Sequence, residues 1–467
     1  MSLARRNQVR KFIPLKLSNS AHHPTMKVTV LSSKSIKPAY GAIPPSTNCD
    51  AIPLTVLDTV NYDQHISGTF FFHPPAPPTA ALELGFAMAL AEYPEWAGRL
   101  TTIDNTTRQG HCRRRSILLN DAGARFVEAT ADVTLDSVMP LEPTPEIDAE
   151  PAPKPRRRRR QCRWRGRRAH AGPGHSATRG VAIDPVPVHD RVSFFVPRTP
   201  PMVEFEHRGA EFMACREQKK KAAAAGGDGV VAARVRFSRD MISRLKARTA
   251  ASAAARVPRS SLRPYRYSTM ACILGHLWRC ITVARGLGGG DAAAVITRMH
   301  ITVDGRARMR VPPVPSGYAG NAVLWARPAA VARELVGRPL GHAAEAISRA
   351  VAAVDDGYFR SFIDFASSGA VEEEGLVAAA DGAKGSHSLD IEVFSLMGLP
   401  SGELDLGAGR PFLYMPSYLP EEGLVFVVPS FNGDGSVHAQ VSLFSHAMDV
   451  FKDCFYSMDL DAAVARL

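Results

Sequence analysis

The chain has 467 residues, 45% of them hydrophobic, which is the balance of an ordinary globular protein with room for two domains. It contains no apolar run near the roughly 20 residues that a membrane helix needs. Its first 25 residues are basic but lack the apolar centre of a secretory signal. We therefore predict a disordered leader over residues 1–25 and no membrane segment.

The formal net charge of +12 is concentrated in one stretch. Lys154 and ten arginines fall between residues 153 and 179 without a single acidic residue. The leader adds five more basic residues, so the rest of the chain is mildly acidic. The seven cysteines are odd in number and form no Cys-x-x-Cys pair. This pattern argues against a disulfide framework or a metal site and predicts a cytoplasmic protein.

The hydrophobic pattern of the first half predicts a mixture of strands and helices. Residues 28–33 and 66–72 alternate like strands, and residues 80–92 carry apolar side chains at helical spacing. Residues 117–127 are typical of a β-hairpin with a turn at residues 120–123. Residues 216–230 are polar and of low complexity, which predicts a crossover linker between two domains.

The second half shows the same alternation. A strand over residues 232–237 precedes a short helix over 239–246 and an apolar helix over 268–284, in which we expect His276 to be a core residue. A strand around His300, a helical region over 340–365 and a strand at 391–394 follow. A hairpin over 424–444 then leads to a closing helix over 445–458. Two halves of this kind predict a two-domain α/β fold.

The first candidate for catalysis is His300, which stands four residues before Asp304. An imidazole oriented by a carboxylate is the usual general base, although this spacing also arises often by chance. Residues 286–290 are rich in glycine, but no Gly-Lys-Ser/Thr follows them, which argues against a nucleotide-binding loop.

Four motifs occur in order and together resemble the BAHD family of plant CoA-dependent acyltransferases. They are AGRL from Ala97, VDGRARM from Val303 running on to GYAGN, LDLGAGRP from Leu404, and GDGSV from Gly433. The resemblance implies a two-domain sandwich of the chloramphenicol-acetyltransferase type, with mixed sheets, helices and a channel between the domains. Its domains would be residues 26–215 and 231–467, with about 391–400 returning to the first.

The resemblance also implies an activity and roles for particular residues. The nearest subgroup is similar to grass enzymes that pass a hydroxycinnamoyl group from CoA to an amine such as agmatine or tryptamine. Such a protein binds no cofactor or metal, uses acyl-CoA as co-substrate with an amine or alcohol acceptor, and is expected to be a monomer. His300 does not occupy the family's base position. The turn with Asp405, Gly407 and Gly409 would be structural, and the candidates for CoA or channel contacts are Ser268, Thr269, Arg306 and Asn321.

The family's catalytic His and Asp belong where this sequence has Arg159 and Arg163. Arginine stays protonated at neutral pH, so it cannot act as the base. The resemblance stops near Pro151 and resumes at Ala177, which we interpret as a reading-frame change or an incorrect exon in the coding sequence; the alternative is genuine divergence of this segment. We therefore expect little or no transferase activity. The alternatives are a catalytically dead acyltransferase-like protein and a non-specific nucleic-acid binder acting through residues 156–168.

Overall fold

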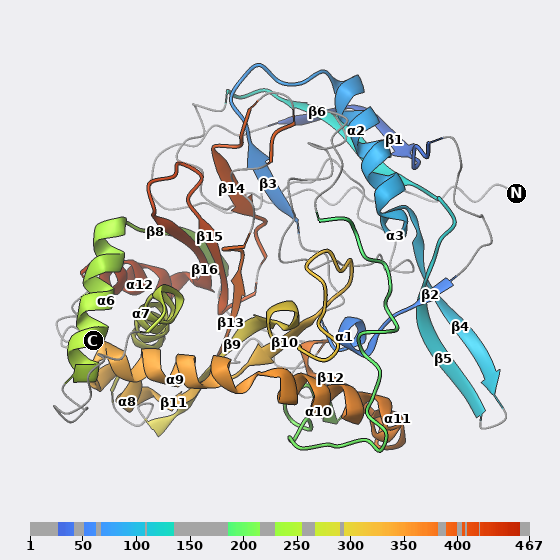
Figure 1. Ribbon diagram of the computed structural model, residues 1–467. Helices are drawn as coiled ribbons and strands as arrows, with labels where there is room; N and C mark the ends of the chain where they lie inside the picture. The colour runs from blue at the N-terminus through green and yellow to red at the C-terminus, as the bar shows by residue number, and fades with distance from the viewer. Residues whose placement is uncertain are drawn as a thin grey trace, which may run out of the picture.

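Figure 1 shows the computed structural model, which describes residues 27–41, 51–61, 67–107, 110–134, 185–214, 229–254, 267–289, 294–381, 389–398, 404–406, 409–419 and 421–457. The predicted leader and the arginine-rich stretch lie outside these residues, as does almost all of the predicted linker.

The largest sheet comes entirely from the second half of the chain. Its strand order is β10 (Val323–Ala326), β9 (Ile296–Asp304), β13 (Asp390–Ser395), β15 (Leu424–Pro429), β16 (Val437–Phe444) and β8 (Val230–Phe237), and β11 (Ala329–Val331) also pairs with β9. β13 runs parallel to both of its neighbours, whereas the other pairs are antiparallel. Residues 391–395 are all buried, which suits a central strand covered on both faces.

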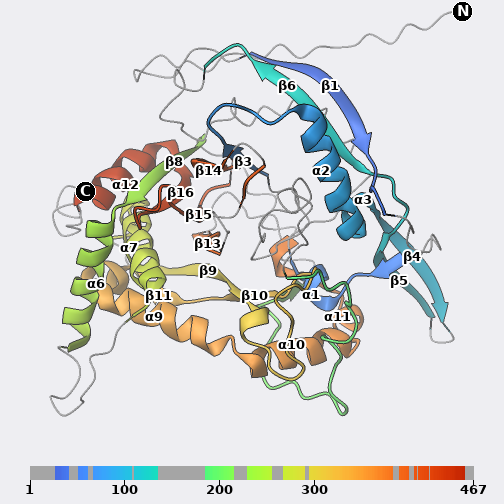
Figure 2. The same cartoon turned by 45° about the horizontal axis from the view of Figure 1, so that its top comes forward.

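Helices cover one face of this sheet (Figure 2). They are α6 (Arg239–Ala254), α7 (Thr269–Ala284), α8 (Ala332–Gly337), α9 (Leu340–Ala353), α10 (Asp356–Ser367) and α12 (Ser445–Ser457). Every residue of α7 from Ala271 onward is buried, as its apolar sequence predicts. His276 Nε2 lies 3.1 Å from the carbonyl oxygen of Phe455, and burial lowers the pKa of His276 to about 4. The prediction of a core histidine is confirmed.

The opposite face of the sheet meets a strand pair that links the two halves. β3 (Gly68–Phe71) pairs antiparallel with β14 (Leu413–Pro416). Tyr414 of β14 packs against an aromatic cluster on the sheet that includes Trp325, Phe394 and Phe426. In that cluster, successive ring centroids lie 5.4 Å apart.

The remaining elements of the first half are two small sheets and two helices. β1 (Val28–Ile36) pairs with β6 (Ala124–Ala131), and the second sheet has the order β2 (Ala51–Pro53), β5 (Gly110–Leu118), β4 (Arg99–Thr107). α2 (Thr79–Glu92) and α3 (Pro94–Ala97) lie beside them (Figure 1). None of the described helices combines the length and the apolar composition that a membrane span requires.

Two sequence-based expectations about strand pairing are wrong. The predicted return of residues 391–400 to the first domain fails because β13 is the central strand of the second-half sheet; residues 413–416 of β14 make the crossing instead. The predicted hairpin over residues 117–127 also fails, because β5 and β6 belong to different sheets. Its turn is held by another segment: Gly123 N–H donates to Ala97 O at 3.0 Å, and Arg99 Nη1 donates to Gly123 O at 2.9 Å.

Two predicted helices differ in extent from their prediction. α6 continues to residue 254, beyond the predicted end at 246. The helical region over 340–365 is divided into α9 and α10, because Asp355 caps a new helix by accepting a hydrogen bond from Tyr358 N–H at 3.0 Å.

Residues 185–214, the end of the predicted first domain, pack against the second half of the chain. Phe195 and Phe212 belong to the main hydrophobic core together with Phe362 and Phe365 of α10. β7 (Phe212–Ala214) pairs with β12 (Leu376–Ala378), close to α11 (Ala370–Glu373). These residues form a bridge from the first half of the chain onto α10.

Candidate functional site: the junction between the two halves

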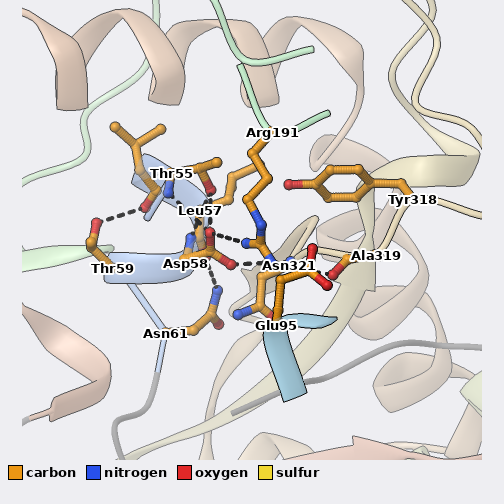
Figure 3. Close-up of polar contacts among 12 residues, drawn as sticks. Thr55, Leu57, Asp58, Thr59, Asn61, Glu95, Arg191, Tyr318, Ala319 and Asn321 are labelled. Atoms are coloured by element: carbon orange, nitrogen blue, oxygen red, sulfur yellow. Dashed lines mark hydrogen bonds and ion pairs between the residues drawn. The ribbon is translucent and has the colours of Figure 1, made fainter. Parts of the chain in front are cut away.

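Asp58 joins three segments that are far apart in the sequence (Figure 3). It lies in α1 (Val56–Thr59), where it forms a capping box with Thr55. Its Oδ2 accepts hydrogen bonds from Arg191 Nη1 and from Thr55 N–H, both at 2.9 Å, and its Oδ1 accepts one from Asn321 N–H at 3.2 Å. The Arg191 and Asp58 side chains are only 3% and 7% exposed. A buried ion pair therefore fixes α1 to the 185–198 segment and to the turn at residue 321.

The turn that ends in Asn321 is organised by Arg306, one of the residues that the resemblance gave as candidates for CoA or channel contacts. The guanidinium donates to Asp304 Oδ1 at 3.2 Å, Tyr318 O at 2.9 Å and Gly320 O at 2.6 Å. It also lies over the Tyr318 ring, with 5.5 Å between Cζ and the ring centroid. Arg306 Nε is buried and has no hydrogen-bond partner among the described residues. The guanidinium is thus used mainly to close the turn.

A glycine in the same turn lets the 185–198 segment approach closely. Val188 N–H donates to Gly317 O at 2.9 Å, and Ala319 N–H donates to Val188 O at 2.8 Å. A Cβ atom at Gly317 would overlap the carbonyl oxygen of Val186. Only glycine fits there without moving the backbone.

A second buried carboxylate holds His189. Its Nδ1 lies 2.8 Å from Oε1 of Glu95, whose side chain is fully buried, while the imidazole is 35% exposed. Burial by itself would lower the pKa of His189, but the hydrogen bond and the negative charge of Glu95 outweigh it, so the pKa is raised. Neither residue was selected from the sequence, and no local signal could have revealed the pair, because Glu95 lies 94 residues before His189 in the chain.

His300 and Asp304 do not form a catalytic pair. Asp304 accepts hydrogen bonds from the Arg306 backbone and side chain. The carboxylate facing His300 is Asp390 on the adjacent strand β13, with 3.9 Å between His300 Nε2 and Asp390 Oδ2. In a strand, residues four apart share a face but lie about 13 Å from each other, too far for a hydrogen bond. The expectation that His300 is not the base agrees with this geometry.

The predicted CoA candidates on α7 have structural partners. Ser268 Oγ accepts a hydrogen bond from Ala271 N–H at 3.1 Å and so caps the helix. Thr269 Oγ1 accepts one from Lys246 Nζ of α6 at 3.3 Å. Lys246 thus lies beside the N-terminus of α7, a 16-residue helix whose first backbone amides carry partial positive charge. Both contributions make this end of α7 positive.

The glycine-rich turn after β13 is closed by its own carboxylate. Gly409 N–H donates to Asp405 Oδ1 at 3.0 Å, and Gly409 has φ +94°, a conformation that favours glycine. Gly407 lies outside the described residues, as do Arg159 and Arg163. Across the described part of the chain, no three His, Cys, Asp or Glu side chains are placed to hold a metal ion.

The sheet face that meets β14 also carries a carboxylate that sequence reasoning did not select. Glu392 is 5% exposed and lies between His300 and Leu424 in the strand register. Its neighbours Ile391 and Val393 belong to the core on the helical side, so Glu392 faces the other way, as Phe394 does. This face therefore combines aromatic rings with a buried acid.

The fold is shared with solved structures of similar length. The structure matches vinorine synthase with a TM-score of 0.62 at 16% sequence identity, covering 92% of this chain and 98% of that one. It matches TRI101 of F. graminearum, in complex with coenzyme A and deoxynivalenol, with a TM-score of 0.62 at 16% identity, covering 88% and 98% of the two chains. The predicted two-part α/β fold class is confirmed.

The chain belongs to the Transferase family, whose model matches residues 26–149 and 175–458. It is 52% identical to agmatine hydroxycinnamoyltransferase 1 of Oryza sativa subsp. japonica, over 92% of this chain and 99% of that protein. It is 51% identical to agmatine coumaroyltransferase-1 of Hordeum vulgare, over 93% and 100%. The resemblance to BAHD acyltransferases is confirmed. Residues 150–174, which contain Arg159 and Arg163, fall between the two matched ranges.

Proposed function

We propose that this chain has the scaffold of an enzyme that transfers a hydroxycinnamoyl group from its CoA thioester to agmatine or a similar amine. The observation that carries the proposal is the 52% identity to agmatine hydroxycinnamoyltransferase 1 over nearly the full length of both chains. Relatives at 38% and 32% identity are named for putrescine and tryptamine, which are also amines. We further propose that the protein is a cytoplasmic monomer.

The acyl donor is proposed to bind at the N-terminus of α7. Coenzyme A carries phosphate groups, and a helix N-terminus with an adjacent lysine is suited to bind them. Thr269 and Lys246 lie together there, and Ser268 is the capping residue. Arg306 and Asn321 support the site indirectly, because they fix the turn at the junction of the two halves.

The acceptor is proposed to be cationic because of the acid on the sheet face. Glu392 is buried beside His300, with Asp390 two residues earlier on the same face of β13. A negative charge beside a binding surface favours a positively charged ligand over a neutral one. The aromatic cluster around Phe394 gives the neighbouring surface an apolar character.

Chemistry requires a group that takes the proton from the amine as the amine attacks the thioester carbonyl. The positions where the resemblance expects this base and its aspartate hold Arg159 and Arg163. We therefore propose that the printed sequence has little or no turnover. Non-specific nucleic-acid binding through residues 156–168 also remains a prediction; a specific function of that kind has no support from the described residues.

The function can be tested in a repaired chain, in which residues 150–174 are replaced by the aligned segment of rice agmatine hydroxycinnamoyltransferase 1. We expect the repaired chain to form p-coumaroylagmatine from p-coumaroyl-CoA, detected by mass spectrometry, and to prefer amines to alcohols of similar size. A repaired chain that acylates only alcohols, or that binds no CoA thioester in calorimetry, would overturn the proposal.

In the repaired chain, Glu392→Gln is expected to raise the KM for agmatine at least about tenfold, equivalent to about 1.4 kcal/mol, because a charge-assisted contact is lost. The KM for p-coumaroyl-CoA should change less than about twofold. Glu334→Gln is the matched control, since Glu334 lies in an exposed ion pair with Arg338. An equal rise in both KM values would show that Glu392 shapes the site as a whole and does not contact the acceptor in particular.

His300→Ala is expected to leave the kcat of the repaired chain within about threefold of its starting value, because His300 faces Asp390 and is not paired with Asp304. General-base loss would instead cost about 100-fold or more. Steady-state kinetics at saturating amine distinguishes the two. A drop of that larger size would make His300 the base after all.

A further inference from the structure

A buried serine, histidine and glutamate lie in series where the bridge meets α10. His207 Nδ1 is 2.9 Å from Glu211 Oε2, and His207 Nε2 is 3.0 Å from Ser361 Oγ. This is the connectivity of a serine-hydrolase triad. Ser361 lies 154 residues from His207 in the sequence, so the arrangement exists only in the folded protein.

Ser361 is not placed to act as a nucleophile. His207 and Ser361 are 0% exposed and Glu211 is 1% exposed, so no substrate reaches them in this structure. Ser361 Oγ also accepts two backbone hydrogen bonds, from Glu204 N–H at 2.9 Å and from Phe205 N–H at 3.0 Å. The series therefore fastens a backbone segment to α10, and we call residues 198–212 the strap.

The hydrogen bonds fix where each proton lies. Two N–H donors occupy both lone pairs of Ser361 Oγ, so its hydroxyl hydrogen is donated to His207 Nε2. His207 is then neutral and carries its proton on Nδ1, which donates to Glu211. Burial alone would raise the pKa of Glu211, but the hydrogen bond from His207 and the charge of Arg327 lower it, so Glu211 stays ionised.

We propose that Ser361, His207 and Glu211 form an acid-sensitive latch that releases the strap when His207 takes a second proton. The added proton makes Nε2 a donor that points at an oxygen already accepting two hydrogen bonds. The hydroxyl hydrogen of Ser361 then has no acceptor in this buried site. The least costly relief is to free the amides of Glu204 and Phe205 from α10.

The other charged and titratable groups around His207 have partners of their own, so the release is confined to the strap. Glu211 is also bound by Arg327 Nη1 at 2.7 Å and by the Tyr358 hydroxyl at 2.9 Å. On the exposed side of the strap, Arg208 pairs with Glu206 and Glu374. At the strap's start, Asp364 of α10 accepts from Arg198 Nε at 2.7 Å and from Met202 N–H at 2.8 Å.

The anchor at Asp364 does not depend on His207. Burial would raise the pKa of Asp364, but the hydrogen bonds from Met202 and Arg198 outweigh it, so the pKa is lowered and the anchor persists in mild acid. Opening is therefore expected from residue 204 to residue 212, while residues 198–202 stay attached.

The test is amide hydrogen exchange of the full chain from pH 7.5 to pH 5, read by mass spectrometry and corrected for intrinsic exchange rates. We expect peptides covering residues 203–212 to open about tenfold to thirtyfold more at pH 5, since one proton bound by an exposed imidazole and not by the closed form gives at most about thirtyfold over this pH range. Peptides from α7 should keep their protection, which separates local opening from global unfolding. Unchanged protection of residues 203–212 would overturn the proposal.

Two variants and a control sharpen this result. His207→Gln cannot be protonated, so its exchange should not depend on pH; a retained pH dependence would remove His207 from the latch. Ser361→Ala should be open at both pH values, because the two amides lose their acceptor. His438→Gln is the control, since His438 lies on β16 and is the partner of Arg236 in the sheet register, away from the strap. It should behave like the unaltered chain.

Discussion

The repaired chain is expected to turn over p-coumaroyl-CoA and agmatine at least about 100-fold faster than the printed sequence. The physical reason is general-base catalysis, which contributes about 10²-fold to 10⁴-fold when a side chain accepts the proton in the transition state. A protonated guanidinium at position 159 or 163 cannot accept that proton. Initial rates of amide formation under identical conditions measure the difference directly.

Two controls separate chemistry from folding in this experiment. Changing the histidine that the graft is expected to supply in place of Arg159 to alanine should return the rate to that of the printed sequence. Both chains should also bind p-coumaroyl-CoA with affinities within a few-fold, because the proposed site at the N-terminus of α7 is shared. If the printed sequence already matched the repaired chain, the proposed inactivity would be wrong and another base would have to be sought, with His189 as the first candidate.

Replacing Asp58 by alanine is expected to reduce the free energy of unfolding by about 3–5 kcal/mol. The change leaves Arg191 buried without its carboxylate, removes the acceptor of Asn321 N–H, and destroys the capping box of α1. Losing one partner of a buried ion pair is costly because the remaining charge has neither water nor a counter-ion. Urea unfolding followed by circular dichroism gives the value.

Asp240→Ala is the matched control, because it also removes an aspartate from an ion pair with an arginine. The Arg244 and Asp240 side chains are 61% and 77% exposed, so this pair is expected to contribute at most about 0.5 kcal/mol. If Asp58→Ala and Asp240→Ala had similar effects, the junction network would not be a source of stability. A larger effect at Asp58 would show that the contact between the halves is part of the cooperative unit.

Local hydrophobic patterns correctly predicted the helices and the hairpin that are specified by their own residues. The apolar run and Ser268 cap of α7, the hairpin of β15 and β16, and the closing helix α12 are all present. Where a turn is held by a distant segment, local patterns failed. The turn after β5 looks like that of a hairpin, but Ala97 and Arg99 bind it, and β6 pairs with β1 instead.

The family, the two-part α/β class and a gap in resemblance between Pro151 and Ala177 could all be predicted from the sequence, because each depends on patterns that are contiguous in the chain. Which charges meet could be read only from the folded structure. Asp58 binds Arg191 133 residues away and the backbone of residue 321, 263 residues away. His207 meets Ser361 across 154 residues. Such partners are selected by packing of whole elements, and a buried carboxylate carries no local sign of which cation will cover it.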